Sequence, residues 1–229
     1  MPESTLLLAI DTCGPTGSVA LGRFDGQSVE ILGQIELEGR NYSATLVAAV
    51  NELLAQASTK LNLLHAMVVV NGPGSFTGVR VGLAAVKGFA EGARIPVVAV
   101  SRLEVMVAKA NVPAAALDAH RNEVYLRLAA PGEPARELLA GAAELAAFHP
   151  PPARIALCDD AAVLLLSAAW SGTTLLRTAP PTAADALRLC APRLAAGEFA
   201  DLALLDGHYL RRSDAEIFGE GSFAASLHL

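Results

Sequence analysis

Residues 72–83, with the sequence GPGSFTGVRVGL, form the glycine-rich turn whose residue types and spacing could do chemistry. The turn follows an apolar strand and leads into a helix, so its free backbone N–H groups favour an anion. A P-loop would need a lysine after its last glycine, but Val79 follows Gly78. A dinucleotide fingerprint would need a third glycine where Thr77 stands. The turn therefore matches neither nucleotide fingerprint and leaves an anion site open.

The same turn also has a purely structural interpretation. Pro73 stiffens it, Gly74 permits a backbone conformation that other residues rarely adopt, and Thr77 is the expected N-cap of the helix. Small residues recur at helical spacing inside that helix, where each glycine costs about 1 kcal/mol relative to alanine. They form two stripes, the first of Gly78, Gly82 and Ala85 and the second of Ala84, Gly88 and Gly92. We expect them to admit both the sheet beneath and a partner helix outside.

The cysteines and histidines predict no metal site. Cys13, Cys158 and Cys190 are odd in number, widely spaced and never in a C-x-x-C pair, which favours buried reduced thiols. The alternative interpretation makes Cys13, which stands in a turn next to Asp11, a catalytic nucleophile. No histidine lies near it in the sequence. No two histidines are close enough to form a local metal-binding pair; they are His65, His120, His149, His208 and His228.

The composition predicts a soluble, cytoplasmic protein that binds nucleic acid weakly by itself. Hydrophobic residues make up 53% of the 229 residues, yet apolar runs such as residues 161–166 are far shorter than a membrane span. The N-terminal stretch has an acidic Glu3 and no basic region, so we do not expect a secretory signal. The net charge is −6, and the scattered basic residues lack the clustered face of a nucleic-acid binder.

The first half of the chain has the pattern of an α/β unit. Apolar residues 5–10 end in Asp11, and residues 18–22 alternate after a turn, which predicts a β-hairpin with a carboxylate at its tip. Asn41 or Ser43 is expected to cap an amphipathic helix. Further strands are predicted at residues 28–37, 66–70 and 95–100, and a second helix at residues 77–92. The alternation of strand, helix and strand predicts a parallel-sheet crossover.

The second half repeats this order, which indicates an internal duplication. Residues 114–117, Asp118, a polar turn and the alternating residues 124–128 match the first hairpin. A strand is predicted at residues 153–157, and helices at residues 161–170 and 182–197, the last interrupted near Pro192. From Ser213 onward we expect a loosely ordered tail. The chain should therefore form two lobes, residues 1–103 and 104–229.

The glycine turn and its continuation, GPGSFTGVRVGL and AAVKGFAEGARIPVVAVSRLE, closely resemble the TsaB (YeaZ) family. The segments LLLAIDTCGPTGSVALG, ALDAHRNEVYLRL and HYLR support the likeness. The resemblance extends well from Leu6 to about Arg127 and more loosely beyond. It implies the α/β fold of actin-like, hexokinase-like and Hsp70-like ATPases, called the ASKHA fold, with two duplicated lobes.

The resemblance also implies a function. TsaB-like proteins are non-catalytic partners that bind and activate TsaD, which transfers a threonylcarbamoyl group to the adenosine beside the anticodon of certain tRNAs. The ATPase TsaE completes the bacterial assembly. TsaD-like catalysis relies on a metal held by an H-x-x-x-H pair on a helix, but the corresponding helix here reads NYSATL from Asn41. We therefore expect an accessory subunit without catalytic residues or a metal, which meets tRNA only through the complex.

Docking of TsaD is expected on the helix near Asn41 and the helix near Thr77, with a homodimer through the same surface when the chain is alone. The expected contact residues are Tyr42, Leu46, Val50, Phe76, Thr77, Arg80, Val81, Ala84 and Ala85. Gly82→Arg is expected to abolish the complex. A second expectation places a nucleotide or another anion at Asp11, Gly14, Gly74 and Ser75. ATP or ADP would then bind at the partner interface, and no other cofactor is expected.

The alternative function is a catalytic ATPase or kinase of the same fold. In such enzymes a hairpin carboxylate like Asp11 orients metal-bound water, while glycine-rich turns bind phosphates. The second lobe should then supply a glycine-rich contact to adenosine, but the corresponding residues 158–161, with the sequence CDDA, have two carboxylates and no glycine. A metalloprotease is not expected, because the sequence lacks H-E-x-x-H and other paired ligands.

Overall fold

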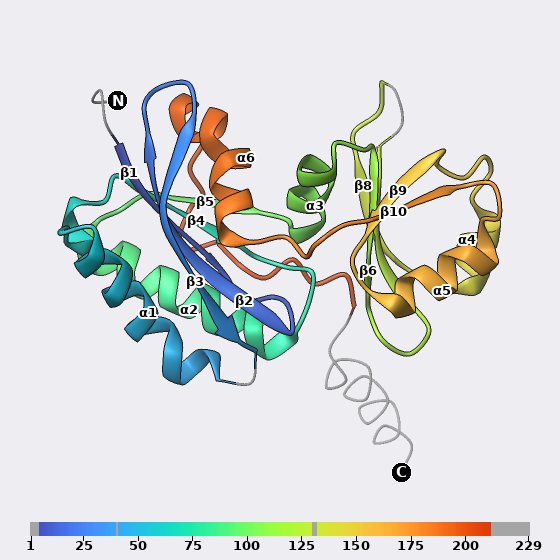
Figure 1. Cartoon of the computed structure of the whole chain (residues 1–229), viewed down its shortest axis with the longest axis horizontal. Coiled ribbons are helices and arrows are strands. Elements are labelled where there is room, and N and C mark those ends of the chain that lie inside the picture. The colour runs from blue at the N-terminus through green and yellow to red at the C-terminus, as the bar shows by residue number, and fades with distance from the viewer. Residues whose placement is uncertain (1–4, 40, 130–131, 212–229) are drawn as a thin grey trace, which may run out of the picture.

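The computed structural model describes residues 5–39, 41–129 and 132–211. In this part the chain forms two lobes, each built on a five-stranded sheet, which lie side by side in Figure 1. The tail that we expect from Ser213 lies outside the described residues. No helix of the described part is long and apolar enough to cross a membrane.

The first sheet has the strand order β3-β2-β1-β4-β5. The antiparallel part consists of β1 (Thr5–Asp11), β2 (Thr16–Phe24) and β3 (Val29–Glu38). The parallel part adds β4 (Ala66–Val70) and β5 (Val97–Val100). Every residue of β4 is buried, as expected for a parallel strand that is covered on both faces. The predicted hairpin, third strand and parallel crossover are confirmed.

Helices cover both faces of the first sheet. The helices α1 (Tyr42–Gln56) and α2 (Phe76–Ala93) lie on one face, and α6 (Ala183–Ala196) lies on the other (Figure 1). A short 3-10 helix, Leu61–Leu63, precedes β4. The glycine turn follows β4 directly and leads into α2. Because β1 and β4 are parallel neighbours, the turn lies beside the end of β1.

The second sheet repeats the first, with the strand order β8-β7-β6-β9-β10. Its antiparallel part consists of β6 (Ala114–Asp118), β7 (Val124–Leu128) and β8 (Arg136–Ala140). Its parallel part adds β9 (Arg154–Leu157) and β10 (Thr174–Arg177). The helices α4 (Ala142–Ala147) and α5 (Asp160–Ala169) connect its strands in the places that α1 and α2 hold in the first lobe. The expected internal duplication is confirmed.

The third helix of each repeat packs on the sheet of the other repeat. Leu103 and Met106 of α3 (Arg102–Ala110) are buried in the core of the second lobe. Leu187 and Cys190 of α6 are buried in the core of the first lobe. The boundary that we expect after residue 103 falls inside α3, and α6 from the second half belongs to the first core. This exchange of helices ties the two lobes together.

The expected N-caps of α1 and α2 are corrected by the structure. Ser75, rather than Thr77, caps α2, because its Oγ accepts a hydrogen bond from the Gly78 N–H at 3.2 Å. Asn41 precedes α1, but its side chain makes no capping hydrogen bond, and Ser43 lies inside the helix. The helix α2 therefore begins one residue earlier than its apolar pattern indicates.

The helix α6 runs through Pro192 without the predicted interruption. The side chains of Cys190 and Leu194, on either side of the proline, are buried against the first sheet and hold the helix there. Five short elements were not predicted from the sequence: the 3-10 helix, α3, β8, α4 and β10. Tertiary packing stabilises such short elements more than their own periodicity does.

Candidate functional site

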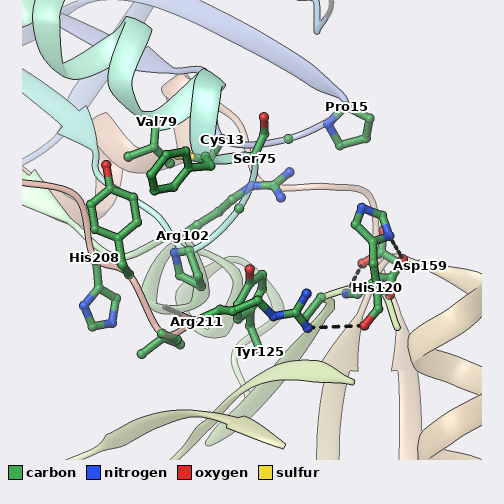
Figure 2. Close-up of a pocket in the computed structure, with 18 of the residues that line it drawn as sticks. Cys13, Pro15, Ser75, Val79, Arg102, His120, Tyr125, Asp159, His208 and Arg211 are labelled. Atoms are coloured by element: carbon green, nitrogen blue, oxygen red, sulfur yellow. Dashed lines mark hydrogen bonds and ion pairs between the residues drawn. The ribbon is translucent and has the colours of Figure 1, made fainter. Parts of the chain in front are cut away.

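A cleft of about 850 Å³ lies between the two lobes. The turns that follow β1 and β4 line one wall, and the turn that follows β6 lines the other. Figure 2 shows Arg102, Ser75 and Pro15 on the first-lobe side and His120, Asp159 and Arg211 on the second-lobe side. In open α/β sheets, ligands bind at such carboxyl ends of the strands.

A buried carboxylate organises the first-lobe wall. Asp11, the last residue of β1, is 1% exposed, and its Oδ1 accepts a hydrogen bond from the Cys13 N–H at 2.8 Å. Burial raises the pKa of Asp11 above its usual value, and Arg102, whose Nε lies 3.8 Å from Asp11 Oδ2, opposes this rise. Asp11 therefore lies behind the wall, whereas Arg102 lines the cleft.

Close approach of neighbouring backbone explains the glycines of the turn after β4. Gly72 has a φ of +117°, and a Cβ at this position would lie 2.9 Å from the His208 carbonyl oxygen. At Gly74 a Cβ would overlap the Cys13 carbonyl oxygen, but the backbone is not left-handed. The special conformation that we expect at Gly74 therefore occurs at Gly72 instead.

The first small-residue stripe of α2 faces the sheet. A Cβ at Gly78 would overlap the Thr12 carbonyl oxygen, and a Cβ at Gly82 would overlap Thr12 Oγ1. Thr12 Oγ1 donates a hydrogen bond to the Gly78 carbonyl at 2.7 Å. Gly82→Arg would therefore disturb the packing of α2 on the sheet, so loss of the complex in this variant would not by itself report on an interface.

The second stripe of α2 faces outward. Ala84, Gly88 and Gly92 are exposed, and a Cβ added at either glycine would have no heavy atom within 4 Å. The two stripes thus differ in what surrounds them, although the sequence presents them alike. Packing among the described residues accounts for Gly78 and Gly82 and gives no reason for Gly88 and Gly92.

The second-lobe wall carries an unusual backbone. His120, Arg121 and Asn122 follow Asp118 with φ angles of +60°, +57° and +59°. Such left-handed conformations cost non-glycine residues roughly 1–2 kcal/mol each, and strained turns of this kind gather at functional sites. The His120 N–H donates to Asp118 Oδ1 at 2.8 Å, and the Asp118 N–H donates to Asp159 Oδ2 at 3.0 Å. These hydrogen bonds hold the turn at the cleft.

Residues 206–211 bridge the two lobes. The His208 N–H donates to the Asn71 carbonyl at 2.7 Å, and His208 Nε2 lies 2.7 Å from Glu137 Oε2 on β8. The Tyr209 ring packs 5.1 Å from the Phe76 ring at the start of α2. Sequence reasoning missed this bridge, although the HYLR motif at residues 208–211 was the signal that could have found it.

Glu137 is the second-lobe anchor of this bridge. It accepts hydrogen bonds from Ser101 Oγ at 2.7 Å and from Arg127 Nη1 at 2.6 Å, in addition to its contact with His208. Burial by itself raises the pKa of Glu137, but these hydrogen bonds outweigh burial and lower the pKa below its usual value. No local pattern in the sequence marks this residue.

The structure divides the expected partner-contact residues into two groups. Tyr42, Leu46 and Val50 are buried in the first core, and the Tyr42 hydroxyl donates to the Gly14 carbonyl at 2.7 Å. The prediction that these three side chains contact a partner is corrected, because the core of this chain already uses them. The remaining residues are exposed or half-buried on α2: Phe76, Thr77, Arg80, Val81, Ala84 and Ala85.

The expected anion residues lie near the cleft, with one exception. Gly14, Gly74 and Ser75 line it, whereas Asp11 lies behind the wall. Arg102, which also lines the cleft, was missed because a single arginine at the start of an unpredicted helix gives no motif.

All three cysteines are free thiols. Cys13 and Cys190 are buried, as expected, and Cys158 is half-buried. Burial raises the pKa of Cys158 and of Cys190 to about 12 and raises that of Cys13 well above its usual value. A thiol with so high a pKa forms little thiolate at neutral pH, so the nucleophile interpretation of Cys13 is not supported.

A family model described as "TsaD: tRNA N6-adenosine threonylcarbamoyltransferase" matches residues 31–146. A relative from Haemophilus influenzae, named tRNA threonylcarbamoyladenosine biosynthesis protein TsaB, is 39% identical over 130 residues, which cover 54% of this chain and 53% of the relative. A solved structure from Pseudomonas aeruginosa, described as an uncharacterized protein with similarity to peptidase YeaZ, has a TM-score of 0.75 at 27% identity. That match covers 90% of this chain and 100% of the other.

A more distant solved structure is component A of the (R)-2-hydroxyglutaryl-CoA dehydratase of Acidaminococcus fermentans. Its TM-score is 0.50 at 12% identity, with 84% of this chain and 99% of that chain covered. This likeness shows the fold alone. With its two repeated lobes, that fold is the actin-like ATPase (ASKHA) fold. The chain spans about half the length of the curated relatives it matches.

Proposed function

Because this chain belongs to the family that the TsaD model describes and, within it, to the TsaB (YeaZ) proteins, we propose that it is an accessory subunit in tRNA threonylcarbamoyladenosine biosynthesis. It binds a TsaD-like catalytic subunit and activates transfer of the threonylcarbamoyl group to the adenosine next to the tRNA anticodon. The names of the relatives support the pathway, and the surface of α2 supports the binding role.

The second stripe of α2 is the observation that carries the binding role. Gly88 and Gly92 stand exposed in a helix, where each glycine costs about 1 kcal/mol relative to alanine. No described residue lies within 4 Å of a Cβ added at either glycine. Small side chains let a second helix pack at short interaxial distance, so a partner helix supplies the reason for these glycines.

Apolar side chains add to this surface. Phe76 at the start of α2 is 37% exposed, and Val47 on α1, the helix that packs beside α2, is 49% exposed. We call Val47, Phe76, Arg80, Ala84 and Gly88 the α1–α2 outer face. Apolar and aromatic side chains together with arginine are enriched in protein interfaces. The same face serves for a homodimer when the chain is alone, so that self-association and TsaD binding compete.

The geometry favours this accessory role over an ATPase or a kinase. In that alternative Asp11 would orient metal-bound water, but its carboxylate is buried behind the cleft wall. Among the described residues, no group of three His, Cys, Asp or Glu side chains is arranged to hold a metal ion. In this proposal a TsaD-like partner supplies the transfer chemistry, a TsaE-like ATPase supplies ATP hydrolysis, and tRNA binds the complex.

Size-exclusion chromatography with the TsaD protein of the same organism tests the docking face. Wild-type chain is expected to co-elute with TsaD, and Gly88→Arg is expected to elute separately, because the arginine side chain occupies the space of the partner helix. Gly172→Arg is the matched control, since this second-lobe glycine is also exposed with no neighbour within 4 Å of an added Cβ. Co-elution of Gly88→Arg with TsaD would remove α2 from the interface.

A further inference from the structure

Arg102 has hydrogen-bond donors that the described residues do not satisfy. The residue is 5% exposed, and its Nε is buried without a hydrogen-bond acceptor among the described residues. The Oδ2 atom of Asp11 is 3.8 Å from this Nε, which is beyond hydrogen-bond distance. A guanidinium offers five N–H donors in a planar fork, and a buried donor without an acceptor is costly. The Arg102 N–H groups therefore have no acceptor among the described residues.

The side chain of Arg102 is directed into the cleft. Figure 2 shows its guanidinium extending toward Ser75, on the side of the cleft where Pro15 also lies. A Cβ at Gly14 would overlap Arg102 Nη2, so the guanidinium lies directly against the backbone of the β1–β2 turn. An acceptor for its remaining donors must therefore come from the cleft side.

The N-terminus of α2 faces the same space. Gly74, Ser75 and Phe76 line the cleft at the start of this helix of 18 residues. Ser75 Oγ satisfies the Gly78 N–H, but the N–H groups of Phe76 and Thr77 have no hydrogen-bond acceptor in the described part of the chain. These free N–H groups and the helix dipole give this end a positive potential.

We propose that the cleft binds a small phosphate monoester, with its phosphate group between the Arg102 guanidinium and the N–H groups of Phe76 and Thr77. Arginine forks and helix N-termini both favour phosphate oxygens. The cleft of about 850 Å³ exceeds the size of the phosphate group and has room for its organic part. This site goes beyond the docking function and does not depend on it.

The second-lobe wall limits the charge of the ligand. Asp118 and Asp159 line this wall. Asp118 Oδ2 lies 3.0 Å from His120 Nδ1, and Asp159 Oδ2 accepts a hydrogen bond from the Asp118 N–H. Arg211 lies on the same wall but pairs with Glu123. Carboxylates in a cleft of lowered dielectric repel further negative charge, so a monophosphate is favoured over a diphosphate or a triphosphate.

Isothermal titration calorimetry of the full chain with inorganic phosphate and with glycerol 3-phosphate tests the site. Ser75→Asp places a carboxylate where the phosphate group would bind, and aspartate is as good an N-cap as serine. We expect this variant to fold and to bind both probes at least about tenfold more weakly than wild type. Asn51→Asp, at an exposed position of α1, introduces the same charge and is expected to change the affinity less than about twofold.

A second variant distinguishes loss of the phosphate site from a local effect of Ser75→Asp on the α2 N-cap. Arg102→Lys keeps a positive charge beside Asp11 but loses the planar fork, so we expect roughly fivefold weaker binding of both probes. The proposal is overturned if wild type binds neither probe at about 10 mM, or if both variants bind with wild-type affinity. Tighter binding of pyrophosphate than of phosphate would overturn the preference for a monophosphate.

Discussion

The two lobes share one strand order but differ at the turn where their central strands end. Asp11 and Asp118 occupy equivalent places, and each Oδ1 accepts a hydrogen bond at 2.8 Å from the N–H two residues later. The Asp11 side chain is 1% exposed beside Arg102, whereas the Asp118 side chain is 24% exposed beside His120. The duplicated turn has therefore kept its local hydrogen bond and changed its surroundings.

The two equivalent turns have different structural roles. In the first lobe, Thr12 and Cys13 pack so tightly against α2 that only glycine fits at Gly74 and Gly78. In the second lobe, the equivalent turn also lines the cleft, and it carries three left-handed residues. The first turn fixes the position of α2, and the second forms an open wall.

The largest effect is expected where the first lobe is packed most tightly. Gly78→Val forces a side chain against the Thr12 carbonyl and should lower the free energy of unfolding by about 3 kcal/mol or more. Ala161→Val, at an exposed position near the start of α5, should change it by less than about 0.5 kcal/mol. Urea denaturation measures both, and equal effects would contradict the difference between the lobes.

The second-largest change in the free energy of unfolding is expected at the bridge between the lobes. Because the pKa of Glu137 is lowered in the folded state, its stabilising effect is present above the usual value of 4.5 and is lost as the pH falls through the folded-state pKa. Glu137→Gln should therefore lower the free energy of unfolding by about 2 kcal/mol at neutral pH. The difference from wild type should shrink in acid. Urea unfolding across pH measures this, and a difference that does not depend on pH would contradict the assignment.

The smallest effect separates the two stripes of α2. Gly88→Ala should raise the free energy of unfolding by about 0.5–1 kcal/mol, because the position is helical, exposed and without close neighbours. Gly82→Ala should lower it by about 1 kcal/mol, because its Cβ would overlap Thr12 Oγ1. Thermal unfolding of the two variants should show shifts of opposite sign. Shifts of the same sign would mean that both stripes share one environment.

Local patterns predicted much of the fold. The β1–β2 hairpin, β4, α2 and the duplicated order of the second half were all predicted, because period, burial and turn residues are visible in short windows. The exchange of α3 and α6 between the lobes was not, since it depends on contacts between segments far apart in the chain. The short elements α4 and β10 were missed for the same reason.

The candidate site was less predictable than the fold. The apolar stripe of α1 suggested an interface, yet Leu46 and Val50 are buried in the core, because one helical pattern serves either purpose. Arg102 and His208 reach the cleft from segments that are distant in sequence from the glycine turn. Ser75 and Gly74 were predicted because the turn itself contains them.

Reconstituted tRNA modification by TsaD and TsaE tests the central claim, that this chain activates TsaD through the α1–α2 outer face. We expect strong threonylcarbamoylation with wild-type chain and with Gly172→Arg, and near-background modification with Gly88→Arg or with no accessory chain. Full modification without this chain, or with Gly88→Arg in its place, would contradict the account.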